Sequence, residues 1–145
     1  MVLDPEIWGP KYWFVFITIS LNYPLYPNEI SKKKYYDLIQ NIPLFIPVKD
    51  ISNSFSKLLD DFPVTPYLDS RESFIKWIHF IHNKMKILYN KPELTLEEFL
   101  EQYHENYKNL EVKEEAIKIH ASLNNLNPAR ADELDEIINC KTNCK

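Results

Sequence analysis

The chain of 145 residues carries 17 basic and 21 acidic side chains, which give a net charge of −4. Its length suits one domain, and a hydrophobic content of 45% with 14% aromatic residues argues against disorder over most of it. The acidic balance argues against a general nucleic-acid binder, and a single glycine excludes the glycine-rich loops of P-loop and dinucleotide-binding proteins.

The first predicted helix begins at Pro10 and ends at Leu21, before Pro24. Proline suits a first turn because its missing N–H would be unpaired there anyway. The helix is apolar on most sides, so we expect it to lie centrally in the core. Its most apolar run, 12–21, is shorter than the roughly 20 residues that span a bilayer, so no membrane segment is predicted.

Asn28 is expected to cap a second helix over Glu29–Gln40, because a short polar side chain can accept a hydrogen bond from a first-turn amide. Leu38 is predicted to face inward from this helix. A third helix is predicted from about residue 50 to residue 61. Its buried stripe is expected to be Phe55, Leu58 and Leu59.

Ser70 is expected to cap a fourth helix that continues to about Tyr89, with apolar residues recurring at helical spacing. Thr95 and Glu98 have the spacing of a capping box and predict a fifth helix. The fold class is therefore all-α, a bundle of four helices with a short fifth.

The chain becomes more polar after Tyr107. We therefore predict a helical bundle domain over 1–107 and a polar, helical C-terminal extension over 108–145. The extension holds two candidate amphipathic helices, at 112–123 and 129–138, and a terminal CxxxC formed by Cys140 and Cys144. It is expected to pack on the domain or on a protein partner.

Three local patterns occur in a set order. They are WGPKYW at 8–13 with Tyr-Pro at 23–24, Phe-Ile-Pro at 45–47, and Trp77 followed by His-Asn at 82–83 and Lys-Pro at 91–92. Together they resemble the Erv/ALR family of FAD-linked sulfhydryl oxidases over roughly 8–107. The resemblance implies a four-helix bundle with a short fifth helix that holds FAD. It also implies electron transfer from a CxxC disulfide, through the flavin, to oxygen.

The resemblance further implies a set of cofactor-binding positions. Aromatic side chains would surround the flavin and its adenine, while a histidine, an asparagine and a lysine would contact polar parts of FAD. In this sequence the matching residues are Trp8, Trp13, Trp77, His82, Asn83, Lys91, Tyr103 and Tyr107.

The sequence departs from the family pattern where the chemistry is expected. The two cysteines of the family CxxC are replaced by Val48 and Ile51, so no catalytic residue is assigned. Only a thiol can exchange with a disulfide, and an aliphatic side chain cannot substitute for it. Ile17 stands where the family usually has a histidine, and Lys86 where it has an asparagine. Loss of these polar positions is typical of a pseudoenzyme.

Cys140 and Cys144 are the only cysteines. They could act as a redox pair like the family's flexible shuttle cysteines, or be free thiols or a structural crosslink, which would close only a small loop. His79 and His82 are three residues apart, a spacing compatible with a metal. Two histidines without a third ligand are more often structural, so no metal is predicted.

The sequence predicts a catalytically degenerate sulfhydryl-oxidase-like protein that acts as a binding or structural module. By resemblance it would form a homodimer or pair with a related oxidase, in the cytoplasm or in a virion or viral factory of a large DNA virus. The alternative is an active FAD-linked thiol oxidase that uses Cys140 and Cys144. A third interpretation is a helical interaction module without a family relationship.

Overall fold

In a computed structural model of the protein, residues 1–108 are described, and they form five α-helices, one short 3-10 helix and no strand. The all-α prediction is confirmed for this part of the chain. Residues Met1–Tyr103 make one compact unit, and a second begins at His104. The predicted helices at 112–123 and 129–138 lie outside the described residues, as do Cys140 and Cys144.

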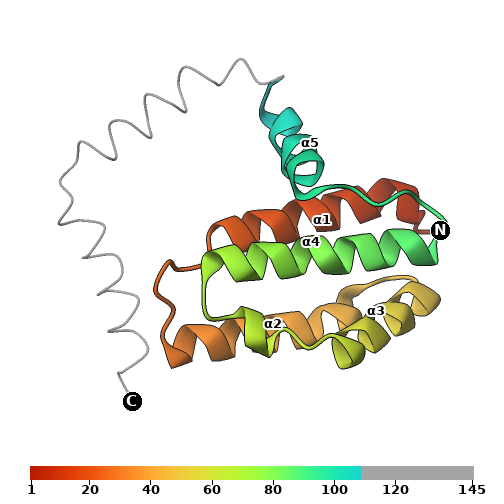
Figure 1. Cartoon of the computed structure of the whole chain (residues 1–145). Helices are drawn as coiled ribbons and strands as arrows, with labels where there is room; N and C mark the ends of the chain where they lie inside the picture. Colours follow the sequence, from red (N-terminus) through yellow and green to blue (C-terminus); the bar gives the residue numbers. More distant parts are fainter. Residues whose placement is uncertain (109–145) are drawn as a thin grey trace. The chain divides into compact units, whose positions relative to one another are not determined.

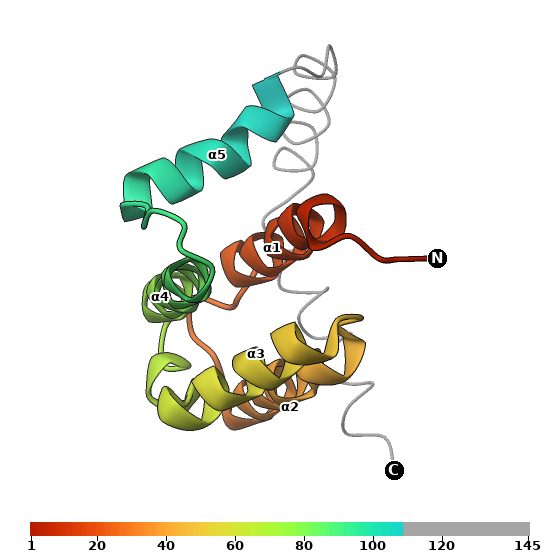
Figure 2. The ribbon, with the colours of Figure 1, turned by 90° about the vertical axis from the view of Figure 1, so that its right-hand side faces the viewer.

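The first four helices pack in two layers (Figures 1 and 2). α1 and α4 lie antiparallel in one layer, while α2 and α3 form the other, with α3 also packed on α4. The elements in chain order are α1 Pro5–Leu21, α2 Glu29–Phe45, α3 Lys49–Asp61, the 3-10 turn η1 Thr65–Tyr67, α4 Arg71–Leu88 and α5 Leu96–Lys108.

α1 begins five residues earlier than predicted. Asp4 caps it by accepting a 2.9 Å hydrogen bond from the amide of Glu6, and Pro5 occupies the first-turn position that we had assigned to Pro10. Pro10 lies inside the helix, where it removes one backbone hydrogen bond. The predicted central placement is also wrong, because Ile7 and Val15 remain exposed.

α2 continues past the predicted end at Gln40 and includes Pro43. The proline is tolerated because the helix ends two residues later. Its carbonyl is also satisfied, since the Ser52 hydroxyl donates to it over 2.7 Å. Leu38 does not face inward as predicted but is exposed, and its neighbour Ile39 is buried.

The predicted caps are confirmed. The Asn28 side chain accepts the amide of Ser31 at 2.8 Å, and the Ser70 hydroxyl accepts the amide of Ser73 at 3.1 Å. In the predicted capping box, Glu98 accepts the Thr95 amide and Thr95 accepts the Glu98 amide, at 2.7 and 3.2 Å.

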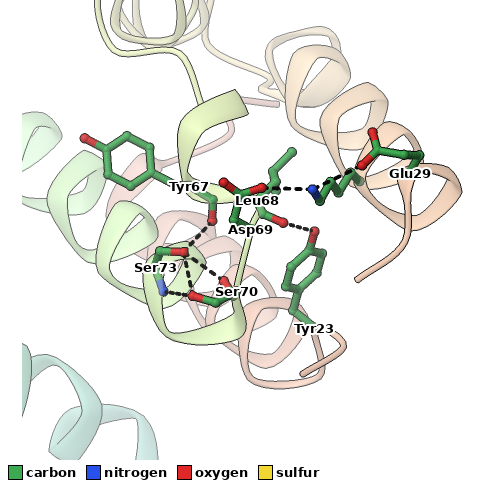
Figure 3. A network of polar contacts seen from close by, with 8 residues as sticks. Tyr23, Glu29, Tyr67, Leu68, Asp69, Ser70 and Ser73 are labelled. Carbon is green, nitrogen blue, oxygen red and sulfur yellow. Dashed lines mark hydrogen bonds and ion pairs between the residues drawn. The ribbon is translucent and has the colours of Figure 1, made fainter. Parts of the chain in front are cut away.

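A buried tyrosine joins the two loops at the end of the bundle opposite the N-terminus (Figure 3). The Tyr23 hydroxyl donates to the carbonyl of Leu68 at 2.7 Å, and Arg71 donates to the carbonyl of Tyr23. Nearby, the Lys32 ammonium lies between Glu29 and Asp69, at 3.2 and 2.9 Å. These contacts bring together the chain after α1, the start of α2 and the start of α4.

Candidate functional site

His82 lies on α4 between aromatic side chains of two other helices. Trp13 of α1 meets its ring edge-on, with centroids 4.7 Å apart and planes at 87°. Phe99 of α5 covers it from the other direction, with centroids 4.9 Å apart. Trp13 in turn contacts Phe16 and Phe55, so the aromatic lining continues from α1 to α3.

This aromatic setting changes the chemistry of His82. Its Nδ1 atom is buried and has no hydrogen-bond partner in the part of the chain that the structure describes. Burial lowers the pKa of His82 to about 4, and the nearby positive charge of Lys86 adds to the effect. His82 is therefore a neutral imidazole near pH 7, with one nitrogen that could bond to a ligand.

Asn83, the neighbour of His82, is occupied by the protein itself. Its side-chain amide donates to the carbonyl of Leu94 at 2.8 Å and accepts the amide of Leu94 at 3.0 Å. His79, one turn earlier on α4, contacts the same carbonyl through Nε2 at 2.7 Å. The Asn83 side chain is buried, and both of its polar ends have protein partners.

Two more of the predicted cofactor residues lie near the start of α1. The Trp8 indole N–H donates to the carbonyl of Leu3 at 3.1 Å. The Lys91 ammonium forms a 2.7 Å ion pair with Glu6, in which both side chains are substantially exposed. Both groups are directed to partners within the protein.

The remaining predicted residues are distributed over the bundle. Trp77 is only 1% exposed and donates its indole N–H to the carbonyl of Phe62 at 3.0 Å. The hydroxyl of Tyr103 lies 2.9 Å from the Thr18 hydroxyl. Tyr107 belongs to the second unit and is exposed.

The structure thus brings Trp13 and His82 together and places Asn83 beside them. Trp8, Lys91 and Tyr103 have separate partners. Sequence reasoning did not assign a role at this site to His79, Leu94 or Phe99. The four-residue spacing of His79 and Asn83 on one helix was the available signal, because such residues share a face.

Four positions depart from the family pattern. Three of them carry aliphatic side chains, and the fourth, Lys86, lies one turn after His82 on α4. Ile17 is a core residue that is only 5% exposed. Val48 precedes α3 and gives it no side-chain cap, while Ile51 packs against the core. Lys86 is half-buried one turn after His82, and it forms no ion pair within residues 1–108.

These contacts bear on the expected cofactor. Among the polar atoms of the predicted cofactor residues described above, His82 Nδ1 is the one without a hydrogen-bond partner in residues 1–108. The polar groups of Trp8, Trp77, Asn83, Lys91 and Tyr103 already have protein partners. In this arrangement most of the polar atoms that the resemblance assigns to FAD are therefore engaged within the protein. The described residues also hold no cluster of three or more potential metal ligands.

None of the helices between residues 1 and 108 combines the length and apolarity needed to cross a membrane.

Comparison with known sequences identifies a family. The sequence model of the Erv1/Alr family matches residues 10–104. A protein of Acanthamoeba polyphaga mimivirus is 31% identical over 100 residues, which cover 68% of this chain and 70% of the relative. A protein of Invertebrate iridescent virus 6 is 25% identical over 97 residues, which cover 63% and 87%. Both relatives are provisionally named FAD-linked sulfhydryl oxidases.

Solved structures share the fold. The core of yeast Erv1 superimposes with a TM-score of 0.64 at 20% identity, covering 71% of this chain and 86% of that one. The FAD-binding domain of Erv1 from Saccharomyces cerevisiae gives the same TM-score and identity, with 72% of this chain and 97% of that one covered. At this identity the likeness concerns the fold.

Proposed function

Because the chain belongs to the Erv1/Alr family, we propose that it is a catalytically degenerate sulfhydryl-oxidase-like protein that acts by binding. The observation that carries this proposal is the pair of aliphatic side chains at Val48 and Ile51, where the family resemblance places the redox cysteines. A thiolate is the nucleophile in disulfide exchange, and neither side chain can supply one.

The surroundings of these two positions support the same proposal. Ile51 packs against the core, and Ile17 is buried where the family resemblance expects a polar contact. We propose that FAD is not held here as it would be in an active oxidase. The support is that Asn83, Lys91 and Trp77 direct their polar atoms to protein partners.

For partners, we propose a homodimer or a heterodimer with a related oxidase, with the polar extension over 108–145 as a further protein-binding segment. The two viral relatives favour a viral source. On that basis we propose a role in virion assembly, in the cytoplasm, in a viral factory or in the virion.

The deciding experiment measures the flavin absorbance of the purified full chain and its oxygen consumption with dithiothreitol. We expect a colourless protein without turnover. A yellow protein that consumes oxygen, and that loses this activity in Cys140→Ser/Cys144→Ser, would sink the proposal in favour of an oxidase using the terminal cysteines.

A gain-of-function variant examines the missing pair directly. Val48→Cys/Ile51→Cys restores two thiols, and Val48→Ser/Ile51→Ser is the matched control without them. We expect neither variant to oxidise dithiothreitol, even with added FAD, because Ile17 and Lys86 remain. Turnover in the cysteine variant alone would show that the loss of oxidase activity is due to Val48 and Ile51 and not to Ile17 or Lys86.

A further inference from the structure

One side chain makes two hydrogen bonds to the connection between α4 and α5. The amide group of Asn83 donates to the Leu94 carbonyl at 2.8 Å and accepts the Leu94 amide at 3.0 Å. A side-chain amide has the same donor and acceptor as a peptide group, so it can pair with a backbone residue in this way. Asn83 therefore pairs with Leu94 much as a neighbouring strand would.

His79 contributes a second donor to the same carbonyl. Its Nε2 atom lies 2.7 Å from the oxygen of Leu94, which can only accept. Nε2 must therefore carry the proton, and its 3.2 Å contact with the Asn83 nitrogen is not a hydrogen bond between them. The Leu94 oxygen then accepts from both His79 and Asn83, which uses its two lone pairs.

The pairing lies directly before α5. Leu94 directly precedes the capping residue Thr95, and Phe99 follows one turn into the helix. Phe99 is 2% exposed and contacts the rings of both His79 and His82, with centroids 5.2 and 4.9 Å away. Phe99, which packs on His82, therefore lies five residues after Leu94, the residue that Asn83 binds.

We propose that Asn83 is a positioning residue that, through Leu94, holds Phe99 over His82 and so controls access to the imidazole. This role goes beyond the proposed function and does not depend on whether the protein is an oxidase. It differs from the cofactor contact that the family resemblance implies for Asn83, because the side chain acts on the backbone of its own chain.

The first experiment compares the rate at which diethylpyrocarbonate modifies each histidine, followed by mass spectrometry. In Asn83→Leu we expect His82 to react about tenfold faster or more than in the unaltered protein, because the two hydrogen bonds to Leu94 are lost. Asn53→Leu is the matched control, since Asn53 is an exposed asparagine on α3. An unchanged His82 rate in folded Asn83→Leu would overturn the proposal.

The second readout separates access from general destabilisation. The pKa of His82, measured by NMR in the folded protein, should rise toward its ordinary value in Asn83→Leu because burial is the main cause of its depression. Lys86 and His79 remain nearby and lower the pKa, while Trp13 and Phe99 are uncharged. The Asn83 side chain itself raises the pKa of His82, so its removal alone would lower the pKa, and a rise would report exposure of the ring. A variant that only loses stability would keep the low pKa, which would contradict the role of Asn83.

The third readout needs no variant and so does not depend on Asn83→Leu folding. In the unaltered protein the Leu94 amide should be protected from hydrogen exchange, because it donates to Asn83. Exchange of this amide as fast as that of an unbonded loop amide would show that the pairing does not hold in solution, and would overturn the proposal.

Discussion

The hydroxyl of Tyr23 donates a 2.7 Å hydrogen bond to the carbonyl of Leu68, 45 residues further along the chain. The Tyr23 side chain is fully buried, and Tyr35 and Phe74 pack against its ring. Burial raises the pKa of Tyr23 to about 12, so the phenol stays protonated and keeps donating well above neutral pH. One hydrogen bond thus joins the loop after α1 to the loop before α4.

Tyr23→Phe should therefore lower the free energy of unfolding by about 1–2 kcal/mol, because the Leu68 carbonyl loses its donor. Urea denaturation at neutral pH measures the change. Tyr26→Phe is the control, since Tyr26 is 95% exposed and should tolerate the same substitution. Equal midpoints for the two variants would contradict the structural importance of the Tyr23 bond.

His82 should make stability depend on pH. Its pKa falls from 6.5 in the unfolded chain to about 4 in the folded protein, so the unfolded state binds more protons between these values. Stability is then fully present above about pH 6.5 and decreases as the pH falls toward 4. The loss should approach about 3 kcal/mol, at about 1.4 kcal/mol for each pKa unit.

His82→Leu isolates this contribution from that of the carboxylates. The variant should lose the His82 part of the pH dependence, measured as urea midpoints from pH 7.5 down to about 4.5. At neutral pH it should be at least as stable as the unaltered protein, because a buried nitrogen without a partner is removed. Parallel pH curves for the two proteins would disprove the assignment.

Ile17 has become part of the hydrophobic core. Replacing it with the family's histidine should destabilise the protein by about 2 kcal/mol or more, because a polar ring is buried without a partner. Ile17→Val, which removes one methyl group, should cost about 1 kcal/mol. Thermal melts of the two variants rank these losses. A histidine variant with the same melting temperature as the unaltered protein would show that a polar partner for the ring exists at this position.

Lys91 and Glu6 form an ion pair in which the lysine side chain is 47% and the glutamate 73% exposed. Lys91→Met should change the free energy of unfolding by less than about 1 kcal/mol, since exposed pairs are screened by water and salt. Glu6→Gln should behave alike. A loss well above this range in urea titrations would assign Lys91 a structural role that its exposure does not predict.

The sequence predicted element type better than element ends. Ser70, Asn28 and the Thr95–Glu98 box were recognisable because a cap depends on residues within one turn. Pro10 and Pro43 led to wrong predicted ends for α1 and α2, because proline destabilises a helix interior without excluding it. In both helices the contacts with the rest of the fold stabilise the proline-containing turn, and these contacts cannot be read from the local sequence.

The sequence identified residues of the candidate site but not the groups that they contact. The family pattern pointed to Trp13 and His82, which the structure brings into contact. It could not reveal that Asn83 pairs with Leu94, because the partner is a backbone group whose position depends on the fold of residues 89–95. The burial of His82 Nδ1 likewise depends on Phe99, which no motif links to it.

The apolar pair at Val48 and Ile51 has a practical consequence for handling the protein. Neither of its two cysteines lies within residues 1–108, so no disulfide can contribute to the stability of the helices there. Those helices should assemble equally well in a reducing cytosol and in an oxidising compartment. The domain can therefore be produced, stored and assayed under strong reductant, which would compromise a bundle built around a disulfide.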